Sequence, residues 1–129
     1  MDIRYYVNEE ERIVVCVLNG CRYDFVEVLN RTDNPITNSY YISCRRQDIH
    51  MKDSFRGIAR CAEGDEWNEE YGKKLAYHRA KNAHDKCLFN KCNKMMVYLD
   101  KKTDELADTI SLFGYKLSRN FDKRKRELE

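Results

Sequence analysis

The sequence predicts an α+β fold, in which an N-terminal antiparallel sheet of about five strands is followed by two helices, the second of them long. β-Branched and aromatic runs dominate up to residue 62, and a helical apolar period follows residue 65. A proline-free helix then extends from residue 95 to about residue 126, with a heptad-like pattern up to Leu117. With 129 residues the chain has the size of one domain, 1–129, mostly β over 1–62 and helical over 65–129.

The first strands are expected at 3–7 and 12–18, joined by a polar turn. Strand 12–18 is apolar at both odd and even positions, which is typical of a central strand. Asn19-Gly20 predicts a type I′ hairpin turn, because both residue types accept a positive φ. The returning strand is expected at 21–29, where apolar and charged residues alternate as in a half-buried strand.

The remaining strands are expected after the loop at 31–38, which holds the only proline. Segment 39–45 reads as a strand, and a less regular strand is expected around Ile49. Segment 55–61 completes the sheet, and Gly57 within it predicts that another backbone segment approaches closely.

The first helix is expected to begin at an N-cap formed by Asp65 or Asn68. Gly72 inside it costs about 1 kcal/mol relative to Ala, which indicates that another segment packs against the helix there. Its apolar stripe comprises Trp67, Tyr71, Leu75, Ala76, Ala80, Ala83 and Cys87. The asparagines at positions 90 and 93 predict a break or kink before the second helix.

The second helix carries an apolar seam, in which spacings of three and four alternate as in a coiled coil. The seam consists of Met96, Leu99, Thr103, Leu106, Ile110, Phe113 and Leu117. A helix this long overhangs a small sheet, so we expect it to pair with a helix of another subunit. The simplest assembly is a homodimer with two-fold symmetry, although a higher homo-oligomer is also compatible with the pattern.

No signature of catalysis, of a resident metal or of a cofactor stands out, so we expect a protein that is not an enzyme. Cys87 and Cys92 with His84 invite a zinc interpretation, but the cysteine spacing is wider than usual and no matching ligand pair follows. The six cysteines are therefore expected to be thiols in a reducing compartment.

The expected location is the cytoplasm. The N-terminus has no signal-peptide pattern, and no apolar run approaches the roughly 20 residues of a membrane span. The formal net charge of +2 makes a chain coated with positive charge for nucleic acid unexpected, although basic residues gather after Ser118.

The basic C-terminal end admits two interpretations. Arg119, Asp122 and Lys123 share one helix face, where the cations can bind phosphate oxygens and the carboxylate can accept from a ribose hydroxyl. Phe89 offers a surface on which a base can stack. The alternative is a solvated helix end, whose cations complement the helix dipole.

Segment 57–81 resembles a recurring segment of small phage proteins. There a strand of the form G-x-A-x-C is followed by an acidic turn, D-x-W/F, and a helix carrying G-x-x-L/I-A-x-x-R-A. The matching positions are Gly57, Ala59, Cys61, Asp65, Trp67, Gly72, Leu75, Ala76, Arg79 and Ala80. With its sheet and long last helix, the chain is similar to the phage anti-Thoeris sponge family, which sequesters the cyclic ADP-ribose isomers made by bacterial TIR-domain enzymes.

The resemblance implies a non-catalytic viral anti-defence protein that binds an intact cyclic nucleotide, such as a glycocyclic ADP-ribose, at a dimer interface in the host cytoplasm. The family pocket uses a stacking aromatic residue and an Arg-x-x-Asp-Arg pattern on the last helix. The implied ligand-binding residues are Phe89, Asn90, Asn93, Arg119, Asp122 and Lys123. The last departs from the pattern, because Lys replaces a bidentate Arg with a point charge.

Two alternatives to the sponge stay open at this point. One is a protein inhibitor of a host defence nuclease, of the anti-CRISPR kind. The other is a small nucleic-acid-binding module that uses the basic C-terminal helix.

Overall fold

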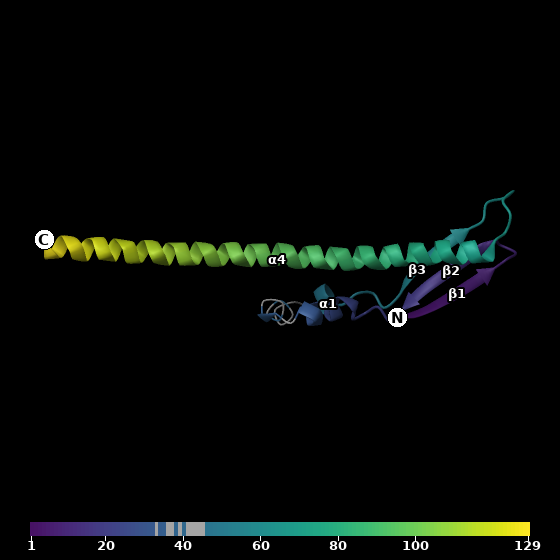
Figure 1. Ribbon diagram of the computed structural model, residues 1–129, viewed down its shortest axis with the longest axis horizontal. Coiled ribbons are helices and arrows are strands. Elements are labelled where there is room, and N and C mark those ends of the chain that lie inside the picture. The colour runs from purple at the N-terminus through teal and green to yellow at the C-terminus, as the bar shows by residue number, and fades with distance from the viewer. Residues whose placement is uncertain (33, 36–37, 39, 41–45) are drawn as a thin grey trace. The chain divides into compact units, whose positions relative to one another are not determined.

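The structure, a computed structural model, describes residues 1–32, 34–35, 38, 40 and 46–129. Its contacts divide the chain into a first unit, residues 1–93, and a second unit, residues 94–129. In the described residues the fold is α+β, with a three-stranded antiparallel sheet and short helices preceding a long C-terminal helix (Figure 1).

The sheet consists of β1 (Asp2–Asn8), β2 (Ile13–Asn19) and β3 (Phe55–Arg60), in the order β1-β2-β3. These strands confirm the predictions for 3–7, 12–18 and 55–61, and β2 is the central strand, as its composition indicated. In the register of the sheet, Cys16 lies between Tyr5 and Gly57. Alternate residues of β2 are fully buried, whereas those between them are half-buried.

The strand predicted at 21–29 is wrong, because this segment forms helix α1 (Asp24–Thr32). Gly20 does adopt a left-handed φ of 77°, but the chain leaves the sheet there. The amide of Cys21 donates to the carbonyl of Asp53 at 2.9 Å. The buried positions that follow are Cys21, Phe25 and Leu29. Their spacing of four is a helical period, which the period-two interpretation overlooked.

The strand predicted near Ile49 is also wrong, because a short helix, α3 (Arg46–Ile49), occupies this position. The strand predicted at 39–45 falls mostly outside the described residues. Of the predicted loop at 31–38, the first two residues belong to α1 and several others lie outside the described residues. The expected sheet of about five strands is thus reduced to three strands in the described residues.

Helix α4 (Glu69–Leu128) begins as predicted and continues where a break was expected. The backbone N–H of Tyr71 donates to Oδ1 of Asn68 at 3.1 Å, so Asn68 is the N-cap. The predicted break at Asn90 and Asn93 is wrong. Asparagine lowers helix stability by only a fraction of a kcal/mol relative to Ala, and neither proline nor glycine accompanies it.

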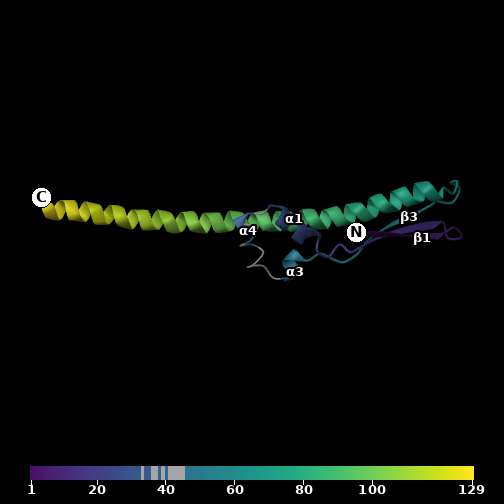
Figure 2. The ribbon, with the colours of Figure 1, turned by 60° about the horizontal axis from the view of Figure 1, so that its bottom comes forward.

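Two glycines let α4 lie directly on the sheet. A Cβ atom at Gly57 would overlap the carbonyl oxygen of Ala76 and the amide nitrogen of Ala80. A Cβ atom at Gly72 would lie 2.8 Å from Cγ2 of Val14. Both glycines therefore mark close packing, as the sequence predicted, and Figures 1 and 2 both show β3 beside the first turns of α4.

The buried face of α4 in the first unit differs from the predicted stripe. Its fully buried positions recur every fourth residue, at Ala76, Ala80 and His84. Tyr71 is 64% exposed and Ala83 is also exposed, so these two positions of the predicted stripe are wrong. Because a helix that touches a sheet through glycine and alanine comes very close, the larger apolar residues lie beside the contact and not in it.

The second unit is helical up to Leu128, and residues 101–129 are all exposed. Its exposed large apolar side chains are Met96, Val97, Leu106, Ile110, Leu112, Phe113, Tyr115, Leu117, Phe121 and Leu128. Despite these residues, the helices that the structure describes lack a stretch long and apolar enough to cross a membrane.

Candidate functional site

The residues predicted to bind a ligand all lie on α4, but in two different units. Phe89, Asn90 and Asn93 belong to the first unit and are exposed, with 63% of Phe89 accessible. Arg119, Asp122 and Lys123 belong to the second unit and are exposed as well. Each group is therefore described within its own unit.

The second-unit group forms part of a basic face. A hollow of about 330 Å³ is lined by Lys116, Arg119, Asn120, Lys123 and Arg126. Four of these five residues are cations, so the basic face favours an anion. The structure brings Arg119 and Lys123 together here, as predicted. Asp122 does not line the hollow, and its backbone carbonyl accepts from Nε of Arg126 at 3.4 Å.

The basic face borders the apolar seam. Asn120 lines the hollow and stands three residues after Leu117, where the heptad repeat places its next seam position. Arg119 lies over the ring of Tyr115, with its guanidinium carbon 5.9 Å from the ring centroid. Arg124 makes the same contact with Phe121 at 5.9 Å but does not line the hollow. The two arginines therefore share an environment and differ in their access to the basic face.

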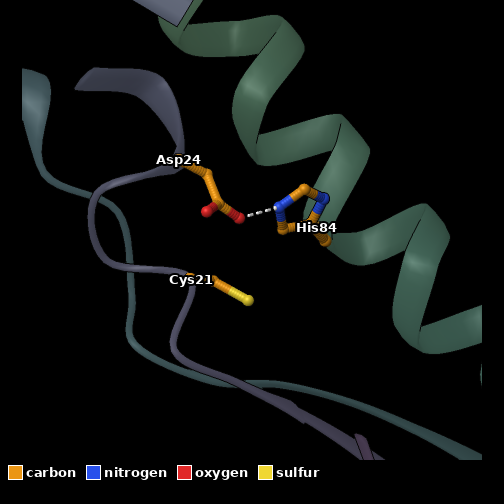
Figure 3. A group of neighbouring side chains, drawn as sticks. All are labelled: Cys21, Asp24 and His84. Carbon is orange, nitrogen blue, oxygen red and sulfur yellow. Dashed lines mark hydrogen bonds and ion pairs between the residues drawn. The ribbon is translucent and has the colours of Figure 1, made fainter. Parts of the chain in front are cut away.

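A second candidate site lies in the first unit, where Cys21, Asp24 and His84 meet (Figure 3). Cys21 and Asp24 enclose a turn, in which the N–H of Asp24 donates to the carbonyl of Cys21 at 3.2 Å. This turn leads into α1, so both side chains are fixed at the start of that helix. His84 comes from α4, sixty residues later in the sequence than Asp24.

His84 is held between two carboxylates. Its Nε2 lies 2.6 Å from Oδ2 of Asp24, and its Nδ1 lies 2.8 Å from Oδ1 of Asp85. The His84 side chain is 4% exposed, whereas that of Asp24 is 23% exposed. Phe55 of β3 packs edge-on against the imidazole, with ring centroids 5.5 Å apart. The ring is therefore fixed in both position and orientation.

Electrostatic effects differ across this cluster. Burial raises the pKa of the Cys21 thiol, and the charges of Asp24 and Asp53 raise this pKa further. The hydrogen bond with His84 lowers the pKa of the Asp85 carboxyl below its ordinary value. These effects favour the protonated form of the Cys21 thiol, although the N-terminus and Lys81 lower its pKa in part, and they favour the ionised form of Asp85, which is also paired with Lys81 at 3.4 Å.

A cavity of about 380 Å³ opens beside the cluster. Its lining comprises Met1, Gly20, Asp24, Glu27, Val28, Arg31, Lys81, His84 and Leu88. Both Asp24 and His84 reach this cavity, so the cluster is accessible to water and to small ions.

A third concavity, of about 310 Å³, lies between β2, β3 and the start of α4. Its apolar lining includes Trp67, Tyr71 and Leu75, and its polar lining includes Arg60 and Asp65. Close to it, Nη2 of Arg12 donates to Sγ of Cys61 at 3.0 Å and to the carbonyl of Asp65. Because Trp67 and Tyr71 line it, this concavity can also accommodate a planar ligand.

Sequence reasoning weighed a zinc site of His84 with Cys87 and Cys92, set it aside, and did not consider Cys21 or Asp24. Cys87 and Cys92, which follow it on α4, are half-buried and do not belong to the cluster with Cys21 and Asp24. The signal that was available is the helical spacing of Cys21, Phe25 and Leu29. This spacing would have predicted a helix from residue 24, with Cys21 and Asp24 at its start and facing the core.

Comparison of the chain with protein-family models, with curated proteins and with solved structures gave no match.

Proposed function

We propose that this chain is a non-catalytic phage anti-defence protein, which sequesters a cyclic nucleotide immune signal such as a glycocyclic ADP-ribose. The single observation that carries the proposal is the basic face at the edge of the seam, where four cations surround one hollow. A diphosphate needs such a cluster, because Arg and Lys form charge-assisted hydrogen bonds with its oxygens. The hollow lies between exposed side chains of one helix, so the proposal needs a second copy of the chain to enclose the ligand.

A homo-oligomer is part of this proposal. The seam exposes apolar side chains such as Ile110, which is 61% accessible, and Phe113 next to it along the seam. A second copy of the helix, packed on the seam, would border the basic face and exclude water from its hollow. A water-poor site with fixed cations suits a protein that acts by stoichiometric capture, since capture requires tight binding and slow release.

The contact with the base rests on the resemblance to the sponge family. In the proposal, Phe89 stacks on the base and Asn90 or Asn93 contributes a polar contact. About 30 helical residues at 1.5 Å each separate Phe89 from Arg119, so these contacts must come from a different copy of the chain than the one whose Arg119 binds the diphosphate. The exposed ring of Phe89 is compatible with this role. Asp122 keeps its assignment to a ribose hydroxyl only on the resemblance, because it does not line the hollow.

The proposal is tested with the full chain and cyclic ADP-ribose isomers. After incubation and removal of free nucleotide, heat denaturation is expected to release the intact ligand, identified by mass spectrometry. Calorimetric titration then compares Arg119→Ala with its matched control Arg124→Ala. Loss of charge-assisted bonds of about 1.5–3 kcal/mol predicts affinity about 10-fold to 100-fold weaker for Arg119→Ala only. Equal affinities for the two variants would show that the ligand does not bind at the basic face.

The single tryptophan gives a check on the location of the ligand. Trp67 lines the concavity in the first unit and lies outside the basic face. Binding at the basic face is expected to leave its fluorescence unchanged. A ligand-dependent change that persists in Arg119→Ala would instead assign the ligand to the concavity around Trp67 and Tyr71.

The basic face also favours a second candidate function, a small nucleic-acid-binding module. The two are separated by salt dependence. A module that neutralises 6–10 phosphates loses about 10³-fold to 10⁵-fold in affinity between 50 and 200 mM salt. Capture of a single diphosphate is expected to change far less over the same range. Anisotropy of a labelled duplex, measured beside the nucleotide titration, decides between them.

A further inference from the structure

We propose that Cys21, Asp24 and His84 form a zinc-binding site, in which Asp85 orients the imidazole of His84. This inference does not depend on the nucleotide. The ligand atoms of Cys21, Asp24 and His84 lie within 4.8 Å of one another. Figure 3 shows the three side chains converging from the turn before α1 and from α4.

The set of donors selects the metal. A thiolate, an imidazole nitrogen and a carboxylate oxygen are all ligands that zinc accepts in tetrahedral sites. Calcium and magnesium prefer oxygen donors throughout, so a site with sulfur and nitrogen does not suit them. Zinc therefore fits all three donors, whereas calcium and magnesium do not.

The positions of the donors are close to what zinc needs. Bond lengths of about 2.0 Å to oxygen and nitrogen and about 2.3 Å to sulfur place tetrahedral donors roughly 3.3–3.5 Å apart. The Nε2 of His84 and Oδ2 of Asp24, now 2.6 Å apart, would separate by less than about 1 Å. Asp24 can make this adjustment because its side chain is partly exposed, whereas His84 is fixed by packing.

Asp85 supplies the outer contact that zinc-bound histidines require. Its Oδ1 lies 2.8 Å from Nδ1 of His84, so in the tautomer that leaves Nε2 free for a metal ion, Nδ1–H donates to Asp85. The lone pair of Nε2 is then directed towards Asp24. In the other tautomer, Nε2–H donates to Oδ2 of Asp24 at 2.6 Å. A proton on Nε2 and a metal ion are therefore the two alternatives at this position.

Cys21 distinguishes these two cations. With a proton alone, the thiol would serve only as a buried core group, in contact with the carbonyl of Leu18 at 3.9 Å. Coordination to zinc uses all three side chains and deprotonates the thiol. The fourth position opens onto the cavity of about 380 Å³, where a water completes the tetrahedron.

The test uses the full chain after dialysis against a chelator and titration with Co²⁺ as a spectroscopic substitute for Zn²⁺. We expect one equivalent per chain, visible bands of tetrahedral intensity and a near-ultraviolet thiolate-to-cobalt band, all of which zinc abolishes. Absence of the thiolate band in the unmodified protein would overturn the proposal. In that case a hydrogen bond joins His84 to Asp24 and no metal is involved.

Three variants locate the site. Cys21→Ser is expected to lose the thiolate band, and Asp85→Asn is expected to weaken zinc binding about 10-fold to 100-fold without changing the band. Cys92→Ser is the matched control, because this cysteine lies on α4 outside the cluster, and it should bind as the unmodified chain does. Loss of the band in Cys92→Ser would overturn the assignment. If Cys21→Ser fails to fold, as judged by circular dichroism without metal, the cobalt spectrum of the unmodified chain remains decisive.

Discussion

The two units of this chain place small and large residues in opposite environments. In the first unit, small residues such as Gly57 and Ala80 are buried at the contact between strand and helix. In the second unit, large residues such as Ile110 and Phe113 are exposed along one helix. The first unit therefore contains a close buried contact between strand and helix, whereas residues 101–129 of the second unit are all exposed.

This difference has an energetic basis. A single helix in water is marginal even when its sequence favours helix, because most helix stability in proteins comes from packing of an apolar face. Each seam residue that a second copy covers contributes about 1.5–3 kcal/mol. If a second copy covers the seam, as proposed, that packing supplies most of the stability of this helix.

The largest expected effect comes from breaking the seam with Ile110→Lys. Loss of burial at this position in both copies of a dimer removes about 3–6 kcal/mol, which weakens association by about 10²-fold to 10⁴-fold. Sedimentation equilibrium should show the mass falling to that of one chain. Asp108→Lys, on the opposite side of the helix and also exposed, is the control and should keep the assembled mass. A dimer that survives Ile110→Lys would show that the seam is not the interface.

The next effect concerns the first unit, where Gly57→Ala should be strongly destabilising. The added methyl group would overlap backbone atoms of Ala76 and Ala80, which cannot rotate away as a side chain can. Overpacking of this kind costs about 1–3 kcal/mol, and backbone contacts place the expected loss near the upper end. Urea unfolding of the first unit, followed by Trp67 fluorescence, measures it. An unchanged midpoint would mean that the helix does not rest on β3.

The parts of the fold that could be predicted are those whose residues act locally. β2 was correctly placed because a continuous β-branched run favours a central strand, and Asn68 was correctly placed as one of two N-cap candidates. Segment 21–29 was misassigned because Asn19-Gly20 is as compatible with leaving a sheet as with turning back. Only the burial of Phe25 and Leu29 on the core decides between those outcomes.

In the candidate sites too, features set by local helix geometry could be predicted, whereas those set by tertiary packing could not. That Arg119 and Lys123 share a face follows from helix geometry alone, so the sequence could predict it. The meeting of His84 with Asp24 depends on how α4 packs near the start of α1, and this tertiary contact leaves no trace in local spacing. The proximity of Cys87 to His84 in the sequence was therefore misleading.

A smaller effect is expected at the start of α4, where Asn68→Ala removes the N-cap. The N–H of Tyr71 loses its side-chain acceptor, and such caps contribute about 0.5–2 kcal/mol. Asn93→Ala is the matched control, since it lies within the helix, where alanine is the better helix former. In thermal unfolding, the midpoint should fall for Asn68→Ala and rise for Asn93→Ala. Equal shifts would argue against the N-cap.

The smallest expected change in stability is that of Gly114→Ala, and it tests the contrast between the two units most directly. Nothing lies within 4 Å of a Cβ atom built at this glycine, in contrast to Gly57. On helix propensity alone, alanine should stabilise the second unit by up to about 1 kcal/mol, measured as increased helicity and a higher thermal midpoint. A lower thermal midpoint would indicate that another chain comes close to Gly114, because nothing in the described chain lies near enough to make a methyl group unfavourable there. The sign of the change at Gly114 therefore tests whether a second copy comes as near to this helix as β3 comes to its first turns.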